Sequence, residues 1–568
     1  MEDLFSVWRS PLDKVALSAA KALCAKQPQC SVTYGEDFSA LTIYSYGHYI
    51  TTAAGNNPNT ALTSMLSAMS SPASLPYGTT GIGGTAFIPQ GGFPVTSASP
   101  PAFSVPDQCN IVASGGGGGS DGMGASSFYH FVISPPTGAT APTYFLYCSG
   151  SHTSGGQYFR DLAFNWEATS HPDICIYANT WSCRAINCTF TDSPVAFNAQ
   201  SLQCGLEACT VQYSSGYAGP NGGGPGPATN AFAAVVLAGA QCYAIGPAVF
   251  LQQPQGSPGS APTDTCCISF ESGLEHAVVR DLHISDWSYG ITYAISSLET
   301  ISHCMITNVE ISVYTTCIYM VPSSSAGTIY DQKYTDCVFY LTRNSTNDQS
   351  LVYIFGAGGT IDEIEFIGCT AYQGRLHGYE IHGVTHVKII GGTSSGNGPT
   401  GGAGIAITGG GGPYVFQGVN LDASYPEADN VQSQQYAFLC SGSPTAPVLV
   451  DTCSMQGYSA SPVSVTGTPT QLIITNCPGY NDLNTPISTT APTSSTYAAD
   501  ASSLGGTSIN YYGPSLVIFT NGSNPINFTT NGVLSSIPAN AVVVYYVASP
   551  YDHIKFSAAP AQFSWLGK

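Results

Sequence analysis

The sequence contains very few charged residues. Asp, Glu, Lys and Arg make up 8% of the 568 residues, against about 25% in ordinary globular proteins. Only 13 residues are Lys or Arg, and the formal net charge is −20. Binding to nucleic-acid phosphates or to anionic lipid surfaces requires clustered cations. The composition therefore excludes nucleic acid as a partner and argues against attachment to an anionic membrane surface.

Long apolar runs and cofactor motifs are also missing. No stretch is long and apolar enough to cross a bilayer, so we expect no membrane span. The first residues, Met1–Arg9, include acids and no unbroken apolar core, so we expect no signal peptide. The glycine run 115–119 lacks the Lys-Ser/Thr of a phosphate-binding loop, and the cysteines lack the paired spacing of zinc ligands. We therefore expect no metal and no other cofactor.

Cysteine, in contrast, is abundant and recurs in one local setting. Cys183 and Cys204 are separated by the same 21 residues as Cys188 and Cys209. The same surroundings return along the chain at Cys304, Cys337, Cys369, Cys453 and Cys477. Repeats of about 20–50 residues are typical of solenoids, in which each unit buries its apolar face against its neighbours. Because these units read as short strands next to turn residues, the repeat predicts a parallel β-helix.

The 19 cysteines are an odd number and many occupy apolar strand positions. A free cysteine behaves as a small buried hydrophobe. We therefore expect a ladder of reduced thiols inside the solenoid, with a disulfide framework as the alternative. Free thiols would indicate folding in a reducing cytosol.

The whole chain is predicted to be all-β. Its apolar content of 43%, with 34 Tyr and 24 Phe, is too high for a disordered chain. We expect a right-handed, single-stranded parallel β-helix with an N-terminal helical region and a small C-terminal β domain. The expected boundaries are 1–56 for the N-terminal helical or attachment region, 57–482 for the capped β-helix, 483–508 for a linker and 509–568 for the C-terminal β domain.

Within the N-terminal region, residues 10–26 have the pattern of an amphipathic helix. Ser10 and Asp13 form a pair like a capping box, and Pro11 suits the first turn. This helix either packs on its own domain or mediates trimer contacts or attachment to a larger particle.

Residues 57–97 carry a family resemblance. A short amphipathic helix over 57–69 is followed by Gly83-Gly84, an apolar strand ending at Ile88, and then Pro, Gly, an aromatic residue and Val. This order resembles the start of pectate-lyase-like β-helix proteins, in which the helix caps the open end of the solenoid. The family's Asp before Asn59-Thr60 is absent here.

The complete arrangement resembles a bacteriophage tailspike or a related viral spike. The ending, residues 563–567, is also similar to the termini of viral fibre and spike proteins. The resemblance implies a homotrimer on the virion surface, assembled in the host cytoplasm and held by a baseplate or capsid vertex through its N-terminus. It further implies binding, and often degradation, of a host cell-surface polysaccharide. A spike that only binds its receptor, and a cellular β-helix enzyme or adhesin, are the alternatives.

If the protein cleaves glycan by hydrolysis, Asp286 and Glu310 are the expected catalytic pair. Aligning the coils on their inner positions places these two acids on adjacent coils, where strands are about 4.8 Å apart. Glycosidase carboxyl pairs are separated by roughly 5–9.5 Å. Trp287 and Tyr289 would supply a platform for the sugar ring. Arg343 is an expected binding residue, but it could equally form a plain ion pair with Glu310.

A second candidate cluster consists of Arg375, His377, Tyr379 and Glu380. Cationic and proton-transferring side chains of these types could neutralise a uronate and move its α-proton, which is the chemistry of a polysaccharide lyase. The alternative interpretation is a polar edge of the coil.

Overall fold

The computed structural model describes 27 segments, and nearly all of them are strands. They are residues 29–32, 41–45, 57–70, 73–74, 80–81, 84–88, 92–96, 103–113, 130–134, 144–149, 156–166, 174–193, 195–212, 233–252, 266–295, 299–322, 327–342, 349–398, 401–424, 434–458, 462–480, 508–509, 515–520, 526–530, 533–547, 553–556 and 562–566. The helix expected over residues 10–26 lies outside the described residues. The chain divides into two units, Met1–Ala294 and Ile295–Lys568.

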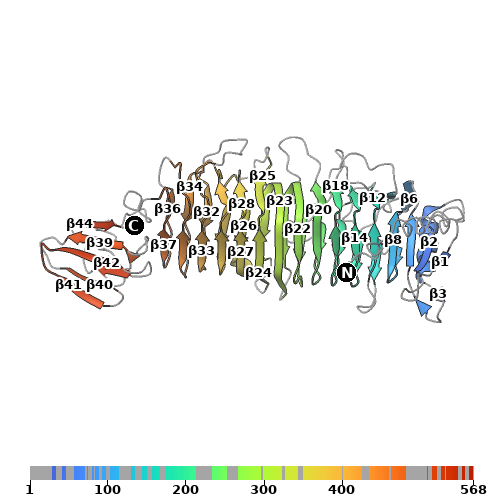
Figure 1. The fold of residues 1–568 in the computed structure, drawn as a ribbon, viewed down its shortest axis with the longest axis horizontal. Helices are drawn as coiled ribbons and strands as arrows, with labels where there is room; N and C mark the ends of the chain where they lie inside the picture. The colour runs from blue at the N-terminus through green and yellow to red at the C-terminus, as the bar shows by residue number, and fades with distance from the viewer. Residues whose placement is uncertain are drawn as a thin grey trace, which may run out of the picture. The chain divides into compact units, whose positions relative to one another are not determined.

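Three ladders of parallel strands make up the first unit, and successive strands of a ladder lie side by side (Figure 1). Ladder A contains β7 (Phe103–Val105), β10 (Tyr144–Ser149), β13 (Ile174–Asn179), β16 (Val195–Ala199), β19 (Ala233–Leu237), β21 (Cys266–Glu271) and the end of β22 (Val278–Ala294). Ladder B contains β2 (Leu41–Ser45), β5 (Gly84–Ile88), β8 (Cys109–Ala113), β11 (Tyr158–Arg160), β14 (Arg184–Ile186), β17 (Gly205–Glu207), the start of β20 (Tyr243–Gln252) and the start of β22. Ladder C contains β6 (Gly92–Thr96), β9 (His130–Ser134), β12 (Ala163–Trp166), β15 (Thr189–Thr191), β18 (Thr210–Gln212), the end of β20 and the middle of β22.

The second unit repeats this plan. Ladder D contains the end of β23 (Thr300–Met320), β26 (Val352–Phe355), β29 (Tyr379–His382), β32 (Ala403–Ile407), β34 (Tyr436–Cys440) and β36 (Val463–Val465). Ladder E contains the start of β23, β24 (Thr328–Thr335), β27 (Thr360–Ile367), β30 (Val387–Ile390), β33 (Tyr414–Gln417), β35 (Val448–Asp451) and β37 (Leu472–Thr475). Ladder F contains the middle of β23, β25 (Val338–Leu341), β28 (Thr370–Tyr372) and β31 (Thr393–Ser395). The predicted all-β parallel β-helix is thus confirmed.

The bends between ladders explain why cysteine recurs. Asn187 has a φ of 51° and precedes Cys188, and Asp336 has the same φ and precedes Cys337. Asn and Asp are the non-glycine residues that adopt this left-handed conformation most readily. The residue before the cysteine also has a positive φ at Cys109, Cys183, Cys204, Cys209, Cys242, Cys304, Cys369, Cys453 and Cys477. The bend turns the next side chain inward, and a small apolar thiol fills the corner of the core.

The thiols form part of that core. Seventeen of the 19 cysteines are described as free and buried, which confirms the expected ladder of reduced thiols. The backbone N–H of Cys188 donates to Cys209 Sγ on the next coil, at 3.4 Å. Burial raises the pKa of Cys242 to about 12, so its thiol stays neutral at physiological pH. Stacked phenylalanines, Phe131, Phe164 and Phe190, fill the same interior.

The predicted capping helix is present as α3 (Pro58–Ser70). The Asn57 side chain caps it, because Asn57 Oδ1 accepts from the backbone N–H of Asn59 at 2.9 Å. The buried face of α3 consists of Ala61, Leu62, Met65, Leu66 and Met69. The helix contacts β2, β6 and β7, the first described strands of their ladders. It therefore covers apolar side chains at the end of the first unit.

Residues 1–56, which were expected to form a helical region, also contribute strands. β2 pairs in parallel with β5, and β1 (Gln29–Val32) pairs with β2 in antiparallel orientation. Ladder B therefore extends into this segment. A short antiparallel pair, β3 (Ala73–Ser74) and β4 (Thr80–Gly81), follows α3. No helix in the described part of the chain is long and apolar enough to cross a membrane.

The C-terminal residues form two antiparallel sheets, in agreement with the small β domain expected there. One sheet has the order β38 (Ser508–Ile509), β43 (His553–Phe556), β40 (Ile526–Thr530) and β41 (Val533–Ile537). The other has the order β42 (Val542–Val547), β39 (Ser515–Thr520) and β44 (Gln562–Leu566). The linker expected over 483–508 lies outside the described residues, apart from its last residue.

Candidate functional site

The outer face of ladder D carries a row of rings beside a carboxylate. In β26, Tyr353 and Phe355 are partly exposed, and they alternate with buried residues. In β29, Glu380 and His382 alternate in the same way. Successive side chains of a strand point to opposite faces. Tyr353 is in register with Glu380, and Tyr319 of β23 is in register with Tyr353, so these five side chains share one face.

Four of these side chains form a continuous aromatic surface. The Tyr319 and Tyr353 rings stack with centroids 5.8 Å apart and an interplanar angle of 27°. Tyr353 stacks on Phe355 at 5.9 Å and 11°, and Phe355 stacks on His382 at 4.4 Å and 26°. We call Tyr319, Tyr353, Phe355 and His382 the aromatic row. Burial and the neighbouring Glu380 charge raise the pKa of Tyr353, so its hydroxyl stays protonated and able to donate.

Neighbouring hydroxyl groups hold the Glu380 carboxylate at the edge of the aromatic row. Ser350 Oγ donates to Glu380 Oε2 at 2.7 Å, and Thr408 Oγ1 donates to Glu380 Oε1 at 3.3 Å. Thr408 Oγ1 also lies 3.4 Å from His382 Nδ1. Side chains on three successive coils therefore fix an oxygen-rich edge next to flat rings.

Buried polar groups shape the backbone that leads into β29. Asn397 is fully buried, and its Oδ1 accepts from the backbone N–H of Gly374 at 2.9 Å. Its Nδ2 donates to the carbonyl of Ala371 at 3.1 Å. His377 is also buried, and its Nδ1 accepts from the backbone N–H of Ala403 at 3.0 Å. Burial lowers the pKa of His377, although Glu380 opposes the change, so this imidazole is neutral and structural.

The predicted cluster of Arg375, His377, Tyr379 and Glu380 is therefore divided between two faces. Tyr379 is fully buried among thiols, and burial raises its pKa well above the usual range. Arg375 and Glu380 are partly exposed. Because Tyr379 and Glu380 are adjacent in one strand, they cannot point to the same side of it. Tyr379 and His377 consequently belong to the interior rather than to a ligand-binding surface.

Asp286, Trp287 and Tyr289 belong to the first unit. Asp286 has a φ of 64° and is 8% exposed. Burial raises the pKa of its carboxyl group, while His283 opposes the rise. Trp287 is only 2% exposed, so the structure corrects its expected role as an open sugar platform. The bend at Asp286 turns the next side chain inward, as it does before the cysteines.

Glu310 belongs to the second unit and lies in β23. Tyr340 Oη donates to Glu310 Oε1 at 2.7 Å, and the Tyr340 ring stacks on Tyr372 at 5.1 Å. Arg343, the alternative partner of Glu310, lies outside the described residues. Asp286 and Glu310 fall in different units, so their pairing stays a prediction.

The aromatic row was not predicted from the sequence, although part of its pattern is visible there. Val352–Phe355 and Tyr379–His382 both alternate a buried aliphatic or aromatic residue with a second, outward one. The register that aligns them was not visible, because the coils differ in length. No group of His, Cys, Asp or Glu within the described segments could hold a metal ion.

Comparison with known proteins shows the fold. No protein-family model matches the sequence, and no curated protein sequence matches it. Among solved structures, a tailspike protein mutant of E. coli bacteriophage HK620 in complex with a pentasaccharide superposes with a TM-score of 0.52 at 11% identity. That alignment covers 98% of this chain and 100% of the other. A second mutant of the same tailspike, also with pentasaccharide, gives a TM-score of 0.50 at 10% identity over the same shares of the two chains. The chain is thus a parallel β-helix protein with the fold of a phage tailspike.

Proposed function

We propose that this protein is a viral spike that binds a host cell-surface polysaccharide across the aromatic row of ladder D. The observation that carries the proposal is the stacking of Tyr353 and Phe355 beside the fixed Glu380 carboxylate. Aromatic faces pack against the C–H faces of sugar rings, and carboxylates accept hydrogen bonds from sugar hydroxyls. The likeness in fold to a tailspike solved in complex with a pentasaccharide supports the same function.

The charges of the site favour a neutral polysaccharide. The polar groups around the aromatic row are the Ser350 and Thr408 hydroxyls, the Glu380 carboxylate and the His382 imidazole. A polyanion would meet the Glu380 charge there, and the net charge of −20 would repel it at longer range. Neutral sugar hydroxyls donate to a carboxylate without this repulsion.

Cleavage of the bound glycan is a separate part of the proposal. Hydrolysis needs one protonated and one ionised carboxyl group. Burial raises the pKa of the Asp286 carboxyl group, so Asp286 is the proposed protonated acid. Glu310 remains the proposed second, ionised carboxylate. Arg375 and Glu380 are the exposed members of the alternative lyase cluster. A spike without cleavage would use the same aromatic row for binding alone.

Adsorption of the labelled protein to a panel of bacterial strains tests this function. We expect adsorption to selected strains that periodate, which cleaves sugar diols, abolishes and that protease treatment leaves unchanged. Polysaccharide purified from such a strain should bind, and its shortening on size-exclusion chromatography would establish cleavage. Binding with no shortening would identify a receptor-binding spike without enzymatic activity. Adsorption that protease removes and periodate does not would contradict the proposal.

We also propose a homotrimer attached to the virion through its N-terminal region. The support is the resemblance in architecture and the low charge of the chain, which leaves faces that association can cover. Light scattering should give about three times the monomer mass of 59.0 kDa. A monomer at micromolar concentration would contradict the trimer and favour a cellular β-helix enzyme or adhesin.

A further inference from the structure

A second group of stacked rings lies on ladder A of the first unit. The Tyr144 and Tyr177 ring centroids are 4.6 Å apart, and Tyr147 and Tyr177 stack at 5.6 Å with an angle of 16°. Tyr144 and Tyr147 are 6.1 Å apart. All three side chains are partly exposed. They come from two adjacent strands, β10 and β13, and form one surface.

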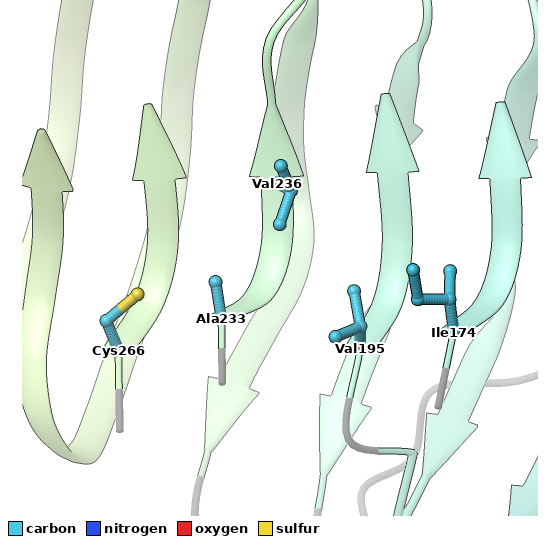
Figure 2. Close-up of a cluster of buried hydrophobic side chains, with 5 residues drawn as sticks. All are labelled: Ile174, Val195, Ala233, Val236 and Cys266. Atoms are coloured by element: carbon cyan, nitrogen blue, oxygen red, sulfur yellow. The ribbon is translucent and has the colours of Figure 1, made fainter. Parts of the chain in front are cut away.

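A buried apolar cluster supports these rings. Figure 2 shows its five side chains, which come from successive strands of ladder A: Ile174, Val195, Ala233, Val236 and Cys266. Tyr144 and Tyr177 pack against this cluster, as does Tyr289 from β22. The cluster members are at most 7% exposed. Because the base is close-packed, the rings above it keep their orientation without a ligand, and binding would cost little ordering entropy.

Polar side chains continue the surface across the neighbouring strands. Asn198 is in register with Tyr177, and Gln200 Nε2 donates to Asn198 Oδ1 at 2.6 Å. The Gln200 side chain also hydrogen-bonds the Glu271 carboxyl group. Burial raises the pKa of Glu271 to about 7, so near neutral pH this group can donate as well as accept. Amide and carboxyl groups of this kind match the mixed donors and acceptors of sugar hydroxyls.

We infer that Tyr144, Tyr147, Tyr177, Asn198, Gln200 and Glu271 form a second saccharide-binding site, which takes a neutral sugar segment and acts independently of the aromatic row. We call these six residues the tyrosine surface. The inference shares only its ligand class with the proposed function, since its residues and its unit are different. Tyr289 packs against the apolar cluster, so its proposed role is to support the tyrosine surface from below.

The number of bound ligands tests the inference. The probes are neutral tetrasaccharides of glucose, galactose and N-acetylglucosamine, titrated calorimetrically into the full-length protein. A probe that fits both sites should bind twice per protomer in the wild type. It should bind once in a Tyr147→Ala/Tyr177→Ala variant and once in a Tyr353→Ala/Phe355→Ala variant. Combining the four substitutions should remove binding.

Two further variants distinguish the loss of a binding site from misfolding of the variant protein. Tyr177 packs on the apolar cluster, so the single variant Tyr147→Ala, at the edge of the surface, should weaken the first-unit site with the smallest effect on the fold. Tyr147→Phe/Tyr177→Phe keeps both rings and should keep both sites.

Unchanged stoichiometry in the Tyr147→Ala/Tyr177→Ala variant would overturn the inference and leave the proposed function standing. Retained binding there, with all binding lost in Tyr353→Ala/Phe355→Ala, would likewise overturn it. Loss of all binding in the first variant alone would instead overturn the aromatic row as a site and support the tyrosine surface.

Discussion

Replacing both Tyr353 and Phe355 by alanine should weaken polysaccharide binding at the aromatic row by about 30- to 100-fold. Each ring that packs on a sugar contributes roughly 1–1.5 kcal/mol through buried area and ring contact. Two rings together therefore supply about 2–3 kcal/mol, and about 1.4 kcal/mol corresponds to a tenfold change in Kd. The substitutions also remove the surface on which Tyr319 and His382 stack. Titration calorimetry on the purified polysaccharide measures the change.

The chain offers matched controls for this experiment. Tyr353→Phe keeps the ring and should change Kd by less than about threefold, since it removes a single hydroxyl group. Tyr330 is a partly exposed tyrosine of ladder E that contacts His303, so Tyr330→Ala removes a ring of the same kind from a different face. That control should bind as the wild type does. Wild-type affinity together with wild-type stoichiometry in a folded Tyr353→Ala/Phe355→Ala variant would mean that the aromatic row is not a binding site.

Raising the pH from 8 to 10 should destabilise the folded protein strongly. Burial raises the pKa of Cys109, Cys242, Cys266 and Cys440 from 9.0 to about 12. The unfolded chain loses these thiol protons above pH 9, whereas the folded chain keeps them. The stability that the neutral thiols contribute is therefore complete below pH 9 and is lost as the pH rises from 9 towards 12. At pH 10 each of the four costs about 1.4 kcal/mol, or about 5–6 kcal/mol together.

Calorimetric Tm values at pH 8, 9 and 10 measure this effect. A Cys440→Ala variant is the control, because it lacks one of the four thiols and its Tm should fall by less between pH 8 and 10 than that of the wild type. Ellman's reagent should leave the buried thiols of the native protein unmodified at pH 8 and modify them in guanidinium. A Tm that stays constant to pH 10, or rapid modification of the native protein, would contradict a core of buried free thiols.

Local sequence was sufficient to predict the repeating architecture. Eleven of the 17 described cysteines follow a bend residue with positive φ, as at Asn187-Cys188 and Asp336-Cys337. Such a bend depends on neighbouring residues alone, so its spacing gives the coil period directly. The Asn57 cap and the apolar face of α3 are local in the same sense. The parallel β-helix and its helix could therefore be predicted without knowledge of the tertiary contacts.

The candidate surfaces depended on long-range register. Tyr319, Tyr353 and His382 come from three coils of unequal length, and only strand pairing brings their rings into one row. Side chains alternate between the two faces along β29, so Tyr379 and Glu380 point to opposite sides. The sequence prediction grouped them only because their side-chain chemistry suits one reaction.

The sequence by itself determined that the chain winds into thiol-lined parallel coils, because bends, strand patterning and burial of small apolar residues are encoded in short segments. Only the tertiary structure decided which side chains face outward. Trp287 was expected at the surface and is buried, whereas Phe355 was not considered and lies in the aromatic row. The reason is that a shift of one residue in strand register exchanges the inner and outer faces. That register is fixed by packing between coils rather than by any single coil.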